Sequence, residues 1–220
     1  MNFFDWIGAM FEAIKNTAAA IVFGIASVFG FNVGIEEPNY KVIEKLDTSI
    51  EVREYNNRIA AETTVLTEDA DKARSQGFEL IAGYIFGKNK GRQSIAMTSP
   101  VEIDSKGKTI AMTSPVQVGV SSGSMTMRFF MPASYSMDTL PQPMDSRVKL
   151  IQLPKATQAI LRFTGSTSDE AVAQKTQQLL EGLKSSRWKA IGPTSAYLYN
   201  PPWTIPFLRT NEVMVGVRRD

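Results

Sequence analysis

The order of strand-like and helix-like segments occurs twice along this chain, and this repetition constrains the fold more than any single motif. In each half, two short alternating runs lead into an amphipathic segment, after which strand-like runs return. Two helices are too few to supply the crossovers of a parallel sheet. We therefore predict a pseudo-symmetric α+β domain with a mostly antiparallel, strongly curved sheet or open barrel. The expected strands are about 40–46, 49–55, 58–66, 147–153, 157–164, 195–199 and 212–218.

The two helices have recognisable beginnings and inner faces. Thr67 is expected to cap the first helix, and Gly87 to end it. The second helix is expected over about 168–185, where Thr167 and Glu170 have the spacing of a capping box. The inner face of the first helix is predicted to consist of Ala70, Ala73, Gly77, Ile81 and Ile85, widened by Phe78 and Ala82.

A shorter repeat lies between the two units. The sequence IAMTSPVEI at 95–103 returns as IAMTSPVQV at 110–118, with a turn-like stretch around 104–108. This pattern predicts a hairpin whose alternate residues share a face. Pro100 and Pro115 cannot donate to a ladder, so each strand is expected to carry a bulge or an open edge there.

The composition excludes several classes of function. The chain has no Cys and no His, so it cannot form a thiol nucleophile, a disulfide, a thiolate or imidazole zinc site, or a Ser-His-Asp triad. Its net charge is +2, and the charged residues are spread along the chain. A nucleic-acid partner is therefore not expected, because phosphate contacts need a clustered basic face.

The N-terminal segment, residues 1–37, differs from the domain expected at 38–220. Residues 17–35 carry no charge and approach the roughly 20 residues that a membrane-spanning helix needs. Residues 1–16 have the spacing of an interfacial amphipathic helix. We expect an apolar N-terminal helix that associates the chain with a membrane. A cleaved signal peptide followed by export, and a helix packed on its own domain or on a partner subunit of a cytoplasmic protein, are the alternatives.

Several motifs together resemble a known family. The doubled IAMTSPV resembles the MTxPV signature of the SOUL haem-binding family. The resemblance extends over about residues 40–218 and includes VREY at 52–55, GYIFGKN at 83–89, RFFMP at 128–132, LPQP at 140–143, RFTG at 162–165 and AYLYNPPW from residue 196. It implies a twisted, eight-stranded, barrel-like sheet with two helices. It also implies a haem or other porphyrin, a tetrapyrrole ligand, held in a shallow apolar surface groove.

The mode of iron ligation departs from part of that family. Members that ligate iron through histidine use the position that is Glu54 here, so the resemblance implies binding without histidine. Met97 or Met112 can offer a thioether to iron, Tyr55 a phenolate and Glu54 a carboxylate. Packing in the sheet and its core is the alternative for the methionines and the tyrosine, and a solvated strand face is the alternative for Glu54.

The resemblance also places the groove against the first helix. The candidate contacts are Arg74, Phe78, Ile81, Tyr84 and Ile85, with core packing as the alternative for the apolar ones. Arg74 is expected to pair with a propionate, and Lys72, Lys88 and Arg209 are further candidate cations. The proline-rich stretch with Trp203 and Phe207 is expected to form a groove wall, a membrane-facing loop or a structural connection.

Three functions follow from these features. The first is non-enzymatic binding of haem or a related tetrapyrrole as a carrier or buffer. The second is an interaction or regulatory module that binds another apolar ligand or a partner helix. The third is an enzyme acting on an apolar, pigment-like substrate, for which the sequence shows no catalytic set.

Overall fold

A single antiparallel sheet organises the chain. The computed structural model describes residues 36–106, 123–200 and 204–220, whose nine strands all pair antiparallel in one sheet. The α+β class is thus confirmed, with one strand more than the resemblance implied. The elements are β1 (Tyr40–Lys45), β2 (Ile50–Tyr55), β3 (Arg58–Leu66), α3 (Ala70–Ile85), β4 (Val101–Lys106), β5 (Ser124–Phe130), β6 (Lys149–Leu153), β7 (Ala156–Phe163), α4 (Asp169–Lys184), β8 (Trp188–Leu198), the 3-10 turn η1 (Pro206–Leu208) and β9 (Asn211–Arg219).

The sheet order shows the predicted pseudo-symmetry. It runs β1-β2-β7-β9-β8-β4-β5-β3-β6. The two units are β2-β3-α3-β4-β5 and β6-β7-α4-β8-β9. Their equivalent strands lie at mirror-related positions in this order, and β8 and β4 are adjacent at its centre. The first strand of each unit pairs with the second strand of the other, β2 beside β7 and β6 beside β3. The sheet is open between its edge strands β1 and β6.

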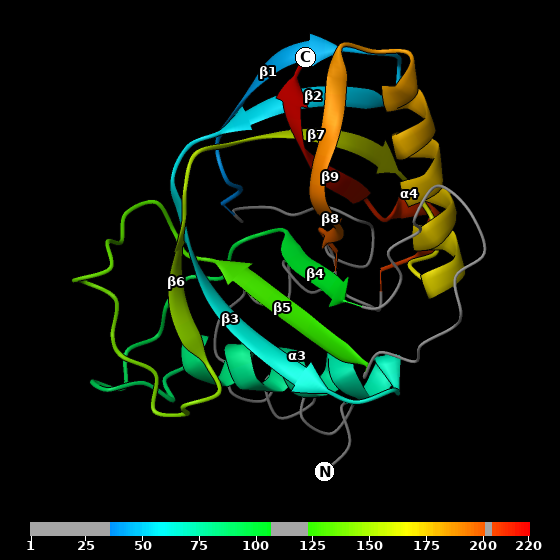
Figure 1. Ribbon diagram of the computed structural model, residues 1–220. Coiled ribbons are helices and arrows are strands. Elements are labelled where there is room, and N and C mark those ends of the chain that lie inside the picture. The colour runs from blue at the N-terminus through cyan, green and yellow to red at the C-terminus, as the bar shows by residue number, and fades with distance from the viewer. Residues whose placement is uncertain (1–35, 107–122, 201–203) are drawn as a thin grey trace.

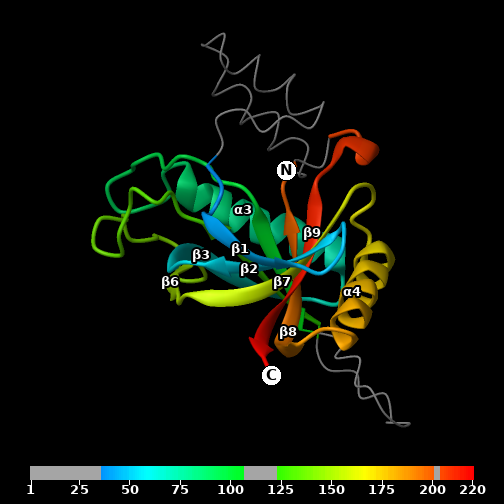
Figure 2. The same ribbon diagram turned by 90° about the horizontal axis from the view of Figure 1, so that it is seen from above.

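Both helices cover one face of this sheet (Figure 1). α3 packs on β3 and β5, where Ile81 and Ile85 meet Met127 and Phe129 in one apolar core. α4 packs on β7, β8 and β9, where Leu179 and Leu183 complete a second core. Seen from above, the helices flank different halves of the sheet (Figure 2). Each repeated unit therefore contributes one helix, but the α4 core also contains Ile50 and Val52 from β2 of the first unit.

The opposite face of the sheet curls into a third core. Neighbouring residues of one strand enter different cores: Phe129 lies in the α3 core and Phe130 in the inner core, as expected for strand alternation. Tyr55, Ile160 and Met214 of one half meet Ala60 and Phe130 of the other there. Because no residue of α3 or α4 belongs to this core, the sheet curves enough to pack against itself. We call this helix-free side the inner face.

The helix caps differ by one or two residues from the sequence expectation. Asp69, not Thr67, caps α3, and its carboxylate accepts from the Lys72 N–H at 3.0 Å. Ser168, not Thr167, caps α4 by accepting from the Ala171 N–H at 3.3 Å. The predicted inner face of α3 is buried at all its positions except the half-buried Ala70 and Phe78. Gly87 follows α3 with φ +108°, as a helix-ending glycine should.

The short repeat forms less strand than predicted. β4 begins at Val101, immediately after Pro100, because proline cannot donate to a ladder. Residues 95–100 belong to no strand, yet Ile95 and Met97 still pack against the α3 core with Val101 and Ile103. β4 pairs with β5 and β8, and the second copy at 110–118 lies outside the described residues.

Two strands differ from the expected set, and one part of the chain is untested. β5 was not predicted, and β8 begins at Trp188, seven residues before the expected 195. The expected apolar N-terminal helix falls outside the described residues. Within the described residues, neither helix has the length and apolar character needed to cross a bilayer.

The cores predict a large difference between two apolar positions. Phe129 is 1% exposed in the α3 core, whereas Leu66 at the end of β3 is 77% exposed. Replacing Phe129 by Ala should lower the free energy of unfolding by about 3–5 kcal/mol through lost contacts and a cavity. Leu66→Ala should change it by less than about 0.5 kcal/mol. Urea unfolding followed by circular dichroism measures both, and equal effects would contradict this packing.

Candidate functional site

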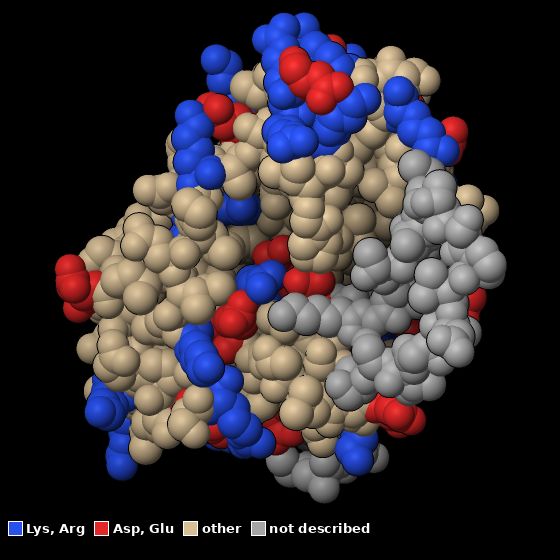
Figure 3. Space-filling view, in the orientation of Figure 1, with Lys and Arg blue, Asp and Glu red and all other residues tan. Residues whose placement is uncertain are grey.

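A row of polar residues crosses the inner face at one level. Each residue is the direct cross-strand partner of the next, so their side chains share a face. The row passes over β7, β9, β8, β4, β5, β3 and β6 in turn and consists of Arg162, Glu212, Tyr197, Glu102, Arg128, Glu62 and Lys149. Acidic and basic side chains accordingly gather in the hollowed middle of the face seen in Figure 3.

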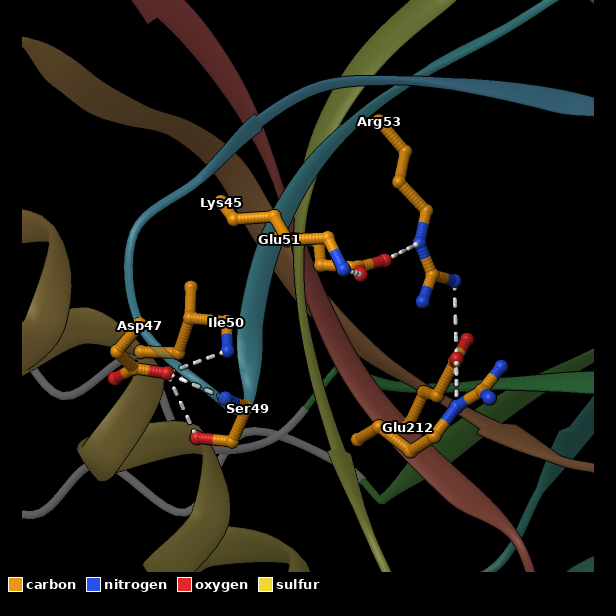
Figure 4. A network of polar contacts seen from close by, with 8 residues as sticks. Lys45, Asp47, Ser49, Ile50, Glu51, Arg53 and Glu212 are labelled. Carbon is orange, nitrogen blue, oxygen red and sulfur yellow. Dashed lines mark hydrogen bonds and ion pairs between the residues drawn. The ribbon is translucent and has the colours of Figure 1, made fainter.

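Glu212 is the most deeply buried charge of this row, with 0% of its surface exposed. Its Oε1 accepts from Arg53 Nη1 and from Arg162 Nε, both at 2.9 Å, and its Oε2 accepts from the Tyr199 hydroxyl at 2.7 Å. Arg53 also donates to Glu51, as Figure 4 shows. Removing a carboxylate from water is costly, and two guanidinium groups and a hydroxyl offset that cost here.

A second cluster occupies the other half of the row. Arg128 donates to Glu62 at 2.7 Å and lies 3.4 Å from Glu102, which also accepts from the Ser195 hydroxyl at 3.1 Å. Burial raises the pKa of Glu102, and the neighbouring Arg128 opposes that rise. The acidic and basic groups of the inner face are thus mostly engaged with one another.

Arg58 fills the middle of the inner face. Its guanidinium carbon lies 4.3 Å from the centre of the Tyr55 ring and 4.9 Å from that of Phe130. Its Nη1 donates to the Tyr197 hydroxyl at 2.9 Å. A stacked and hydrogen-bonded arginine leaves no apolar space for a macrocycle at this point.

The strand that resembles the histidine-ligating segment carries two candidate residues with different environments. Glu54 pairs with Lys155 at 2.8 Å, and both side chains are partly exposed. Tyr55 points into the inner core, and burial raises its pKa to about 12. Met97 is half-buried against the α3 core.

The candidate contacts on α3 mostly serve the core. Ile81, Tyr84 and Ile85 are each at most 1% exposed, and Phe78 is half-buried with its ring 5.5 Å from that of Phe129. The Tyr84 hydroxyl donates to the Pro141 carbonyl at 2.9 Å. The core packing left open by the sequence is therefore present at all four positions. A groove between α3 and the sheet would need the space that these side chains fill.

The remaining candidates are dispersed. Arg74 pairs with Asp71 at 3.0 Å and with Asp169, so it joins α3 to the start of α4. Lys72 is exposed on α3, and Arg209 donates from Nε to the Thr204 carbonyl at 2.8 Å. Met112 and Trp203 lie outside the described residues. Of the candidates in this group that the structure describes, Arg74, Lys72 and Arg209 line neither of the two hollows described below.

An opening does lie on the outer side of α3, and we call it the α3 hollow. Its volume is about 270 Å³. The lining comes from the second half of α3, from Lys88 and from the connection between β5 and β6, and consists of Gln76, Glu79, Leu80, Tyr84, Lys88, Pro143, Asp145, Arg147 and Val148. Tyr84 and Lys88 were identified from the sequence. Asp145, Arg147 and Val148 were not, because they follow the LPQP stretch in a segment without periodicity.

The charges of the α3 hollow are unequally engaged. Arg147 makes two contacts to the Asp145 carboxylate, at 2.7 and 3.0 Å, and these hydrogen bonds lower the pKa of Asp145 to about 2. Lys88 forms no ion pair with any residue that the structure describes. Lys88 therefore lies beside the half-buried side chains of Leu80 and Pro143 without an ion pair to a described residue, and its charge helps to lower the pKa of Asp145.

A second hollow, of about 240 Å³, lies where residues 36–39 pass the turn between β2 and β3. Its lining includes Ile59, Phe130 and Tyr135, but also the carboxylates of Glu36 and Glu37 beside the stacked Arg58. Burial raises the pKa of Glu37. Each hollow has two acidic side chains in its lining, but the α3 hollow has two cations, Lys88 and Arg147, and this one has only Arg58.

Comparison with known proteins identifies related chains. A family model described as SOUL heme-binding protein matches residues 35–216. Heme-binding protein 2 of Homo sapiens is 31% identical over 154 residues, which cover 69% of each chain. Heme-binding protein 2 of Mus musculus is 28% identical over 185 residues, which cover 81% of this chain and 84% of the relative.

A solved structure shares the fold at low identity. The crystal structure of the EcmrR C-terminal domain superposes with a TM-score of 0.56 at 8% identity and covers 82% of this chain and 99% of that one. This likeness concerns the arrangement of strands and helices alone.

The carboxylates of Glu212 and Glu54 differ in burial, and we expect their removal to lower the free energy of unfolding by different amounts. Glu212→Gln should lower the free energy of unfolding by about 3–5 kcal/mol, because the buried Arg53 would lose its buried carboxylate partner and keep only Glu51. Glu54→Gln, which breaks the partly exposed pair with Lys155, should cost less than about 1 kcal/mol. Denaturant unfolding of both variants measures the difference. A mild Glu212→Gln effect would contradict the assigned ion cluster.

Proposed function

This chain belongs to the SOUL heme-binding protein family, and on that premise we propose that it binds haem or a related tetrapyrrole reversibly in the α3 hollow. The observation that carries this assignment is the position of Lys88, which forms no ion pair with a described residue and lies beside the half-buried Leu80 and Pro143. A tetrapyrrole of this kind is a flat apolar ring with carboxylate side chains. It requires an apolar face and a cation at its edge.

The size of the hollow limits how the ligand is held. At about 270 Å³ it falls just below the range of roughly 300–1,000 Å³ that encloses drug-sized ligands. The macrocycle would therefore lie over the half-buried Leu80 and Pro143 with its outer edge in water, while Lys88 pairs with one propionate. Apolar burial of a single face and one charge pair support a modest affinity.

The iron would be bound without a side-chain ligand. The chain has no His, and the raised pKa values of Tyr55 and Tyr84, both about 12, disfavour a phenolate ligand at neutral pH. Tyr84 also donates its hydroxyl hydrogen to a carbonyl. In this proposal the protein is a carrier or buffer and not an enzyme, because its buried acidic and basic groups are engaged with one another.

Binding without ligation predicts that the metal is dispensable. Ferric haem and metal-free protoporphyrin should bind with dissociation constants that agree within about threefold, since apolar burial provides most of the stabilisation. Fluorescence and Soret titrations of the full chain measure both. A haem affinity far above that of protoporphyrin, with a Soret spectrum of a six-coordinate iron, would show that a side chain coordinates the metal.

The Lys88 contact predicts a local charge effect. Lys88→Glu should weaken protoporphyrin binding by about three- to tenfold, because an attractive pair becomes a repulsive one. The matched variant is Lys90→Glu, which makes the same change at an exposed lysine outside the lining. The dimethyl ester of protoporphyrin, which lacks the propionate charges, should bind both variants equally. An equal loss in the Lys90 variant would exclude the α3 hollow as the site.

A further inference from the structure

The most exposed aromatic side chain among the described residues lies at the tip of a short turn. Phe207 is 71% exposed and its neighbour Leu208 is 36% exposed, both in η1 between β8 and β9. Pro206 beside them is exposed as well. A folded domain gains nothing by holding a phenylalanine in water, so a contiguous apolar tip of this kind indicates a contact surface.

The turn that presents these residues is held in place by hydrogen bonds. The Leu208 N–H donates to the Ile205 carbonyl at 2.9 Å, and the Arg209 N–H donates to the Pro206 carbonyl at 3.1 Å. The Gly165 N–H also donates to the Pro206 carbonyl, at 3.1 Å, which ties the turn to the segment after β7. Because the tip is already ordered, it loses little conformational entropy when it inserts into a partner surface.

The η1 tip lies at the same end of the domain as Glu36, the first residue that the structure describes. The Ser99 N–H donates to the Glu36 carbonyl at 3.0 Å, and the Ser99 hydroxyl donates to the Tyr199 carbonyl at 3.1 Å. Ser99 thus joins the first described residue to the start of the β8–β9 connection. Figure 2 shows the η1 turn and the start of the described chain on the same side of the molecule.

The sequence that precedes Glu36 has the composition of a membrane-binding segment. Residues 17–35 contain no charged side chain, and Phe3, Phe4, Ile7, Phe11 and Ile14 recur at amphipathic helical spacing. The tip sequence IPFLR likewise has no acidic residue and ends in an arginine. A lipid surface is the partner that accepts both an uncharged chain and a phenylalanine tip.

We propose that residues 206–208 insert into the interfacial region of the lipid bilayer to which the N-terminal segment attaches the chain. The domain is then held at two points and keeps a fixed orientation on the membrane. This inference does not depend on haem binding, because Phe207 and Leu208 are not part of either hollow.

The absence of cysteine from the chain permits a site-specific test. The full chain with Phe207→Cys is labelled with an environment-sensitive nitrobenzoxadiazole dye and mixed with vesicles of phosphatidylcholine and phosphatidylglycerol. The dye emission should shift to shorter wavelength, and lipids brominated near the headgroup should quench it. Met144→Cys, labelled in the same way, is the control, because Met144 is 68% exposed and lies in the β5–β6 connection.

Each outcome decides the proposal. A membrane-like signal at position 207 but not at 144 supports insertion of the tip. Vesicle-bound protein with a water-like signal at 207 shows that the N-terminal segment alone holds the chain, and it overturns the proposal. Failure of the full chain to bind vesicles, or contact of the tip with another protein only, overturns it as well.

A second measurement uses the unlabelled full chain. Phe207→Ser combined with Leu208→Ser should reduce partitioning into the same vesicles by about tenfold, the loss expected when one large apolar side chain no longer leaves water. Met144→Ser should leave partitioning unchanged. Unfolding midpoints equal to that of the parent chain would show that the loss is not caused by misfolding.

Discussion

The charge of Glu212, removed from water at the middle of the sheet, is the constraint on which the inner face depends. Its carboxylate is tolerated only because Arg53 of β2 and Arg162 of β7 reach it from two neighbouring strands. β2 comes from the first repeated unit and β7 from the second, so the cluster forms only when the units have exchanged strands. One electrostatic requirement thereby fixes the register of the half of the sheet that carries α4.

The same inner face determines where a ligand can bind. Arg58 is stacked between Tyr55 and Phe130, and the polar row on either side of it is internally neutralised. The middle of the curved sheet is therefore filled, and the openings lie at its margins, beside α3 and beside residues 36–39. Of these, the α3 hollow contains two cations, and one of them, Lys88, has no ion pair within the described part of the chain. The filled inner face and this lysine are the reasons for which we propose the α3 hollow as the site of an anionic, apolar ligand.

Local patterns determined most of the fold that could be predicted. β3 was predicted at 58–66 because it is a short strand-like run that follows the turn at 56–57, and α3 because its apolar residues recur at helical spacing. β5 was missed although SMTMRFF alternates well, since the neighbouring repeat suggested a competing hairpin. For the site, Tyr84 lies in α3 and Lys88 follows shortly after the helix end, both within the GYIFGKN motif that the sequence singled out. Arg53 and Glu212 are 159 residues apart, and no local pattern could pair them.

The exchange of first strands also bears on how such a chain could arise. A single unit would leave β3 without β6 at its side, and a second copy would have to donate that strand. Two copies related in this way form an intertwined homodimer. In this chain residues 131–148 connect β5 to β6, so the two units pair within one molecule. Such a linker gives each unit an effective concentration on the order of millimolar for the other. Gene duplication and fusion of an intertwined dimer would thus produce this topology in one step, and each half would have lost the ability to exist alone.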